Sequence, residues 1–333
     1  MIKEAEKTKQ TPGISIKTQL RFAGIFIAAV IVVFFVIDLI TGGKFLDFER
    51  NMQNIKNILG VSMGYTFLVW AQCFMIACGY RDLSWGALMI LVAYSMNIFG
   101  NRFGIFASVL AAVITGTVFL FLNFCIFAIV KIPAWIASLA LAMLYESFGL
   151  YLYLGRETKS LVDVALDINL RTFGRLPWSL IIMLVGLVIV YFIYGRTTIG
   201  FNIRAIGGNQ QVASALGISV RKTLLQMGFI CGLLLGIGMF VQHSYNGFSM
   251  ANSGFSSVAL MFYPMAIAQL ANTLSTRINV IVAAPVCAFL LFSVFNLLTL
   301  FGVQSGTLQE GVLALFLVTF AAIARRGYKG VSK

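Results

Sequence analysis

Long apolar runs separated by short polar connections make up most of this chain. A helix needs about 20 consecutive apolar residues to cross the hydrocarbon core of a bilayer, and runs close to this length recur along the sequence. The pattern predicts about ten membrane-spanning helices, at 22–41, 58–79, 84–100, 103–130, 134–154, 176–195, 223–245, 257–275, 278–300 and 308–324. We therefore expect an all-α integral membrane protein with a single transmembrane domain at 22–326.

The composition supports this fold class, because 60% of the 333 residues are hydrophobic, only 11% are charged and the mean hydropathy is +0.94. A soluble domain of this size cannot bury so much apolar surface. A net charge of +13 would suit a nucleic-acid-binding protein, but the basic residues are scattered at the ends of the apolar runs and form no single stripe. We expect the lipid bilayer as the surroundings of this chain, and no nucleic acid as a partner.

The distribution of basic residues predicts the orientation in the membrane. Ten spans place both termini on one side, and the segments assigned to that side carry 16 of the 24 Lys and Arg residues. Cytoplasmic segments of membrane proteins are enriched in Lys and Arg. Both termini are therefore expected in the cytoplasm, with residues 1–21 and 327–333 as tails.

The longest polar interruption in the second half of the chain is the basic segment 196–222. In it, Asn209 can cap a short helix at 210–216 with its side-chain oxygen, and Gly217 can end that helix in the left-handed conformation. The segment therefore predicts a short, rigid helix that lies along the cytoplasmic membrane surface as a docking site. The alternative interpretation is an ordinary basic loop.

Two pairs of glycines predict close contacts between helices. Gly60 and Gly64 are four residues apart in one span, as are Gly232 and Gly236 in another. This spacing places the small residues on one helix face, where they let a second helix approach closely.

Few polar residues lie in or beside the apolar runs, and such residues in a membrane need partners or line a pathway. Asp82 and Ser84 are possible N-caps of the following helix. His243 is interpreted as a satisfied interface residue, and Asp38 as a group that reaches water. The candidates for a translocation pathway or gate are Gln72, Arg81, Asp82, Ser84, Glu146, Gln242, Gln269 and Asn272. For each amide, the alternative role is a hydrogen bond between helices. For Glu146 the alternative is a structural pairing, and for Arg81 and Asp82 it is an ion pair with each other.

The sequence lacks the patterns of several chemistries. The five cysteines lie within apolar runs without metal-ligand spacing, so we interpret them as packing residues. No phosphate-binding P-loop occurs, and no nucleophile is grouped with a base. We expect a chain without enzymatic activity, catalytic residues, metal or bound cofactor.

Three segments carry a resemblance to a known family. AIGGNQQVASALGISVRK (205–222), DLSWGAL (82–88) and VKIPAWIASLALAMLYESFGL (130–150) resemble, in order and spacing, the permease subunits in the sugar-uptake branch of bacterial ATP-binding-cassette (ABC) importers. Trp135 stands where the family usually has Phe. Residues 266–279, AIAQLANTLSTRIN, lack the usual pair of glycines, which leaves open whether this chain pairs with itself or with a paralogous chain.

The resemblance implies a type II-like importer permease in the bacterial cytoplasmic membrane. Its partners would be a substrate-binding protein, a second permease chain and two ATPase subunits, which hold ATP and Mg. The helix at 208–217 would fit a groove of the ATPase, with the small residues Ala213, Ser214 and Ala215 inside it. The coupling residues implied are Arg204, Gly207, Gly208, Asn209, Gln210, Ala213, Ala215, Gly217 and Arg221.

These observations predict the permease of an importer for a pentose or hexose sugar. A nucleoside importer of the same family is the first alternative. A secondary transporter that carries protons on Asp82 or Glu146 is the second alternative, and a membrane-embedded enzyme is the third.

Overall fold

The computed structural model describes residues 48–130, 132–154, 164–249, 254–276, 278–300 and 309–315, with the single positions 24 and 318. The expected first span at 22–41, Asp38, both terminal tails and most of the expected tenth span lie outside these ranges. In the described part, the elements are α2 (Phe48–Cys78), α3 (Trp85–Phe103), α4 (Ile105–Ile129), α5 (Ala134–Leu154), β1 (Val164–Ala165), η2 (Ile168–Gly174), α6 (Trp178–Arg196), α7 (Thr198–Gly208), α8 (Gln210–Ala215), α9 (Val220–Asn246), β2 (Phe248–Ser249), α10 (Val258–Thr273), η3 (Leu274–Thr276) and α11 (Val280–Leu300).

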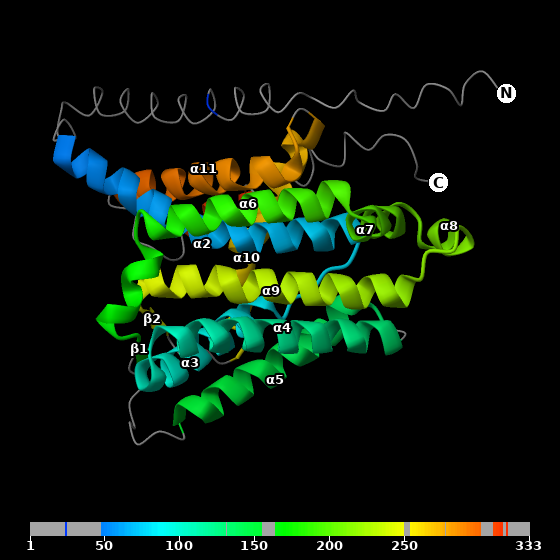
Figure 1. The fold of residues 1–333 in the computed structure, drawn as a ribbon, viewed down its shortest axis with the longest axis horizontal. Coiled ribbons are helices and arrows are strands. Elements are labelled where there is room, and N and C mark those ends of the chain that lie inside the picture. Colours follow the sequence, from blue (N-terminus) through cyan, green and yellow to red (C-terminus); the bar gives the residue numbers. More distant parts are fainter. Residues whose placement is uncertain are drawn as a thin grey trace.

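The fold is a helical bundle in which the long helices run roughly parallel to one another (Figure 1). Six helices of the described residues, α2, α4, α5, α6, α9 and α11, are long and apolar enough to cross a membrane. The shorter helix α10 is also apolar. Eight of the expected spans coincide with helices, from 58–79 on α2 to 278–300 on α11.

Helix α9 lies at the centre of the bundle and packs most extensively against α4 and α2. A Cβ atom at Gly232 would overlap Thr117 and Gly116 of α4, and one at Gly236 would overlap Ala112. On the other side, Gly60 and Gly64 of α2 lie directly against Tyr245 and Gln242 of α9. Both predicted glycine contacts are confirmed.

Two predicted boundaries are wrong. The helix predicted at 58–79 starts earlier than expected, because α2 begins at Phe48. The added turns carry Asn57, whose Oδ1 accepts hydrogen bonds from Gln53 Nε2 and from the Tyr245 hydroxyl of α9. The basic segment 196–222 was expected to hold one helix and holds two, because the apolar residues Ile203 and Ile206 of α7 are buried against the bundle.

The two ends of the bundle differ in structure. At one end, α7 and α8 connect α6 to α9, and α8 projects beyond the long helices (Figure 1). At the other end, β1 pairs antiparallel with β2, matching Val164 with Ser249, and η2 packs against α9. The connection between the spans predicted at 134–154 and 176–195 therefore contains a strand and a 3₁₀-helix in its described part.

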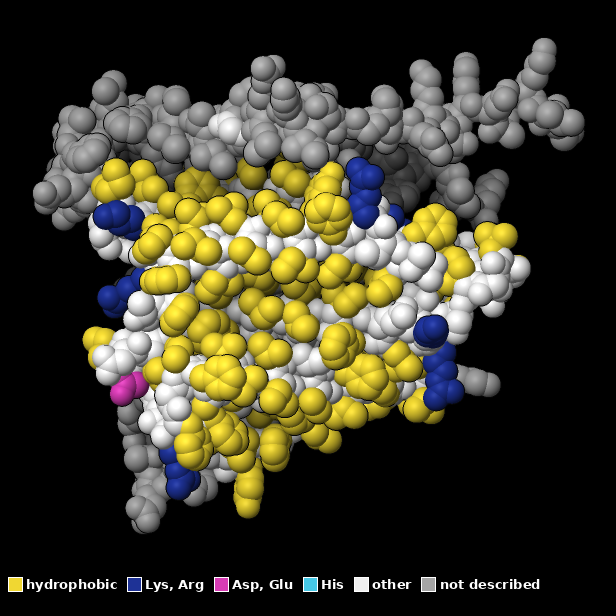
Figure 2. Space-filling model, in the orientation of Figure 1, with side chains coloured by type: hydrophobic (Ala, Val, Ile, Leu, Met, Phe, Trp, Pro, Cys, Tyr) yellow, Lys and Arg dark blue, Asp and Glu magenta, His cyan; other side chains and the backbone are white. Residues whose placement is uncertain are grey.

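Hydrophobic side chains cover the face of the bundle shown in Figure 2, and Lys and Arg side chains lie at its two ends. In the most apolar 18-residue stretch of each helix, only 22% of the α4 stretch and 17% of the α6 stretch are buried. Exposed residues such as Phe106, Ile114, Val188 and Phe192 face outward from these helices. An apolar belt between charged ends is the surface expected against lipid.

Candidate functional site

The first candidate site is the pair of helices α7 and α8 at the basic end of the bundle. Thr197 caps α7 by accepting a hydrogen bond from the backbone N–H of Gly200. Asn209 caps α8, because its Oδ1 accepts from the backbone N–H groups of Gln211, at 2.9 Å, and Val212, at 3.1 Å. Gly217 has φ +84 after the helix. The predicted cap and stop are therefore both confirmed.

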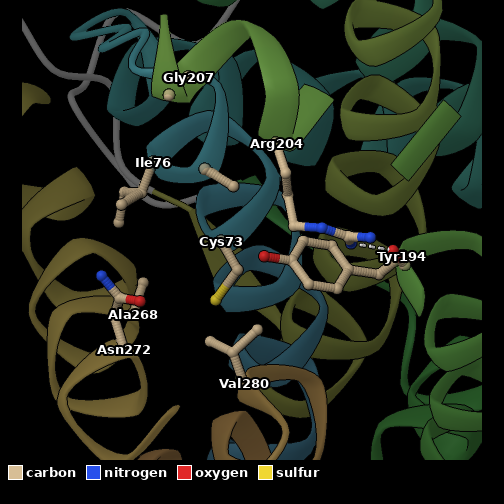
Figure 3. Close-up of a pocket in the computed structure, with 10 residues that line it drawn as sticks. Cys73, Ile76, Tyr194, Arg204, Gly207, Ala268, Asn272 and Val280 are labelled. Atoms are coloured by element: carbon tan, nitrogen blue, oxygen red, sulfur yellow. Dashed lines mark hydrogen bonds between the residues drawn. The ribbon is translucent and has the colours of Figure 1, made fainter. Parts of the chain in front are cut away.

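The predicted coupling residues divide into an inner and an outer group. Arg204 turns inward, where its guanidinium donates to the Tyr194 carbonyl and lies 4.8 Å from the centre of the Tyr194 ring (Figure 3). Gly207 contacts α2 so closely that a Cβ would overlap the Ala77 carbonyl, and Ala213 is 2% exposed. Gly207 is nevertheless exposed on its other side, and the outer members are all exposed: Gly208, Asn209, Gln210, Ala215, Gly217 and Arg221.

Two apolar residues complete the outer surface of this site. Val212 is 54% exposed and Leu216 is 76% exposed. Sequence reasoning selected the small residues Ala213 and Ala215 and missed these larger ones. The signal was present, because positions four apart lie on one face of a helix.

A cavity of about 320 Å³ is lined by residues of α2, α6, α7, α10 and α11. Arg204 and Tyr194 lie on one side of it, and Asn272 and Val280 lie on the other sides (Figure 3). The structure therefore brings the predicted pathway residue Asn272 next to the predicted coupling residues Arg204, Gly207 and Gly208.

Asp82 lies in the connection between α2 and α3 and is 3% exposed. Its Oδ1 accepts from the backbone N–H of Ser84 at 2.8 Å and from the Ser84 hydroxyl at 2.6 Å. Its Oδ2 accepts from Asn123 Nδ2 of α4 at 2.8 Å, and the Tyr145 hydroxyl of α5 donates to Asn123 Oδ1. The carboxylate thus joins the start of α3 to α4 and α5.

Glu146 of α5 is 8% exposed, and its carboxylate accepts hydrogen bonds from the segment that precedes α10. Oε2 accepts from the backbone N–H of Phe255 at 3.0 Å, and Oε1 accepts from that of Ser257 at 2.9 Å. Phe255 has φ +66, a backbone conformation that non-glycine residues seldom adopt. A carboxylate is favourable at such a site because it meets the free N–H groups at the start of a helix.

The remaining pathway candidates are spread over the bundle. Arg81 is exposed, whereas Gln72 and Gln269 are 6% and 8% exposed on α2 and α10. Gln242 is 3% exposed and lines a second cavity, at the end of α9 far from α7 and α8. No group of three or more His, Cys, Asp or Glu side chains suited to a metal ion occurs among the described residues.

Comparison with known proteins places these features in a family. Residues 54–322 match the family model described as "Branched-chain amino acid transport system / permease component". No solved structure matches this chain.

Three curated relatives show the range of similarity. The nucleoside ABC transporter permease protein NupB of Lactococcus lactis is 34% identical over 128 residues, 38% of this chain and 33% of the relative. The guanosine ABC transporter permease protein NupP of Bacillus subtilis is 28% identical over 178 residues, 53% and 50% of the two chains. The ribose import permease protein RbsC of Escherichia coli is 24% identical over 265 residues, 76% and 80% of the two chains. The matches to NupB and NupP thus cover half or less of those relatives.

Proposed function

This chain belongs to the family of permease components of branched-chain amino acid transport systems, and we propose that it forms the translocation pathway of an ABC importer for sugars or nucleosides. It is a multi-pass protein of the cytoplasmic membrane. In the proposed importer, separate ATPase subunits supply the energy, a binding protein delivers the substrate, and a second permease chain completes the pathway. The chain itself acts as a transport subunit and catalyses no reaction.

The proposed topology has ten spans with both termini in the cytoplasm. Eight described helices coincide with expected spans. The end that carries α7 and α8 also carries Arg196, Arg204, Arg221 and Lys222. Lys and Arg mark cytoplasmic segments, so we assign this end to the cytoplasm and the β1–β2 end to the opposite side.

The observation that carries the proposal is the exposed apolar surface of α8. This helix is capped by Asn209 and exposes Val212, and Leu216, which directly follows its last residue, is exposed beside it at the end of the bundle where water is expected. Exposed apolar groups on a rigid, capped helix are typical of a surface that a protein partner covers. Because the chain has no P-loop of its own, the partner that fits this position is the ATPase subunit.

The two acidic residues considered for proton transport both have structural partners. Asp82 accepts three hydrogen bonds from Ser84 and Asn123, and Glu146 accepts two from backbone N–H groups. Their positions are explained by helix anchoring, which supports ATP rather than a proton gradient as the energy source.

Copurification and uptake test the proposal. A tagged chain, isolated from membranes that contain its natural partners, should retain an ATPase subunit. Both Val212→Asp and Leu216→Asp should lose that subunit and at least tenfold of ATP-dependent uptake, because a charge would be buried in an apolar contact. Ile168→Asp is the matched control, because Ile168 is 70% exposed at the other end of the bundle. Uptake by the chain alone under a proton gradient, or full retention of the ATPase by both α8 variants, would contradict the proposal.

A further inference from the structure

A cavity of about 340 Å³ lies at the end of α9 that is remote from α7 and α8. Helices α2, α3, α9 and α10 and strand β2 all contribute to its walls. Pockets that hold small molecules have volumes of about 300–1,000 Å³, so this cavity is at the small end of the range. By the orientation proposed above, it lies toward the side from which a binding protein delivers substrate.

The polar part of the wall consists of two buried residues, Gln242 and His243, the half-buried Ser249 and the exposed Asn246, and Asn97 lies behind it as a hydrogen-bond partner. His243 is 2% exposed, and its Nε2 lies 2.7 Å from Asn97 Oδ1. Asn97 Nδ2 donates to Ser249 Oγ at 3.4 Å. Gln242 Nε2 donates to Asn246 Oδ1 at 3.3 Å. Groups of this kind both donate and accept hydrogen bonds, as the hydroxyl groups of a sugar require.

One polar atom of this wall has no hydrogen-bond partner in the part of the chain that the structure describes. Gln242 is 3% exposed, and its Oε1 is buried without a hydrogen bond among the described residues. A buried acceptor that is left unpaired destabilises the fold, so proteins seldom retain one without a reason. A ligand hydroxyl that donates to this oxygen would supply the missing hydrogen bond.

The remaining wall is apolar and uncharged. Tyr65, Met89, Met239 and Phe248 line it, and Phe248 is 51% exposed. None of the eleven residues that the structure places around the cavity is Asp, Glu, Lys or Arg. A free amino acid would bring a carboxylate and an ammonium group that need charged partners, and the wall offers neither. The lining therefore suits a neutral ligand.

We propose that this cavity binds a neutral sugar ring, either a free monosaccharide or the ribose of a nucleoside, and that it rejects free amino acids. This inference rests on the proposed function, because it makes the cavity the place where the permease holds its substrate. Gln242, His243 and Ser249 supply hydrogen bonds to the ring hydroxyls, and Phe248 covers an apolar face of the ring.

Equilibrium binding tests the inference without any ATPase. The full chain in lipid nanodiscs is incubated with tritiated ribose, guanosine or leucine. We expect ribose or guanosine to bind and leucine not to bind. Binding of guanosine alone would identify a nucleoside as the source of the ring, and binding of ribose would identify a free sugar.

Variants locate the binding site. Gln242→Leu should weaken binding about two- to tenfold, the value of one or two neutral hydrogen bonds. Gln226→Leu is the matched control, with the same change on the same helix but outside the cavity. Ser249→Ala gives a second readout if Gln242→Leu does not fold.

Three outcomes would overturn the inference: binding of leucine as tight as that of ribose or guanosine, unchanged binding by both Gln242→Leu and Ser249→Ala, or no binding to the folded chain. Failure of the proposed function would appear separately, as α8 variants that keep their ATPase.

Discussion

The carboxylate of Glu146 accepts a hydrogen bond of 2.9 Å from the backbone N–H of Ser257, a residue 111 positions later in the chain. The Ser257 carbonyl in turn lies so close to Gly86 that a Cβ there would overlap it. The starts of α3 and α10 therefore meet beside the middle of α5. A polar side chain that sequence reasoning considered for the pathway thus fixes three helices together.

Replacing this carboxylate should destabilise the fold. Glu146→Gln keeps one oxygen acceptor and places an NH₂ group opposite a backbone N–H, so we expect a loss of about 1–3 kcal/mol in the free energy of unfolding. Thermal unfolding of the purified chain in detergent measures this loss. Glu310→Gln, at an exposed position, should leave the unfolding midpoint unchanged. Equal stability of the Glu146→Gln variant and the wild type would show that these hydrogen bonds contribute little.

A similar prediction applies to the Asp82 carboxylate, which lies in the connection before α3. All three of its hydrogen-bond partners donate, and Tyr145 fixes the orientation of Asn123 by donating to its oxygen. Asp82→Asn turns an NH₂ group toward a donor and should lower the free energy of unfolding by about 1–3 kcal/mol. Uptake per folded molecule should remain dependent on ATP.

The matched substitution for Asp82 is Asp167→Asn, because Asn can still cap η2 by accepting from the Asn169 N–H. Its stability should stay within about 0.5 kcal/mol of the wild type. If Asp82→Asn instead leaves stability intact and abolishes uptake driven by a proton gradient, Asp82 carries protons.

The two adjacent glycines of α7 should respond differently to the same change. A Cβ at Gly207 overlaps the Ala77 carbonyl of α2, whereas one at Gly208 has nothing within 4 Å. Gly207→Ala should therefore push α7 away from α2. We expect it to lower the free energy of unfolding by about 1–3 kcal/mol and to reduce ATP-dependent uptake. Gly208→Ala should be neutral or slightly stabilising, because Ala favours a helix. Thermal unfolding and uptake together separate the two outcomes, and equal effects of the two changes would contradict the contact.

The cap of α8 should determine how well the ATPase is retained. Asn209→Ala removes the acceptor for the N–H groups of Gln211 and Val212 and should destabilise α8 by about 1 kcal/mol. We expect less ATPase to copurify with this variant, by about fivefold. Asn209→Ser retains a capping oxygen and should copurify with nearly as much ATPase as the wild type. Equal losses in both variants would mean that Asn209 contacts the partner directly.

Much of the fold was predictable because its signals are local. The run 134–154 matches α5 to the residue, and Asn209 and Gly217 mark the two ends of α8 through hydrogen bonds with residues two to four positions away. Helix α7 was missed although Ile199, Ile203 and Ile206 have the spacing of one helix face, because the basic segment around them was interpreted as a connection with a single short helix. The start of α2 was missed because Asn57 contacts Tyr245, which lies 188 residues away.

The sequence by itself determined that this chain is a set of apolar helices with one short, capped helix in a basic segment, because helix periodicity and capping depend on neighbouring residues. Tertiary structure decided what the polar residues do. Asp82 meets Asn123 across 41 residues, Glu146 meets Phe255 across 109, and His243 meets Asn97 across 146. Such pairs form only when separate helices pack in one particular register, and no local pattern encodes that register.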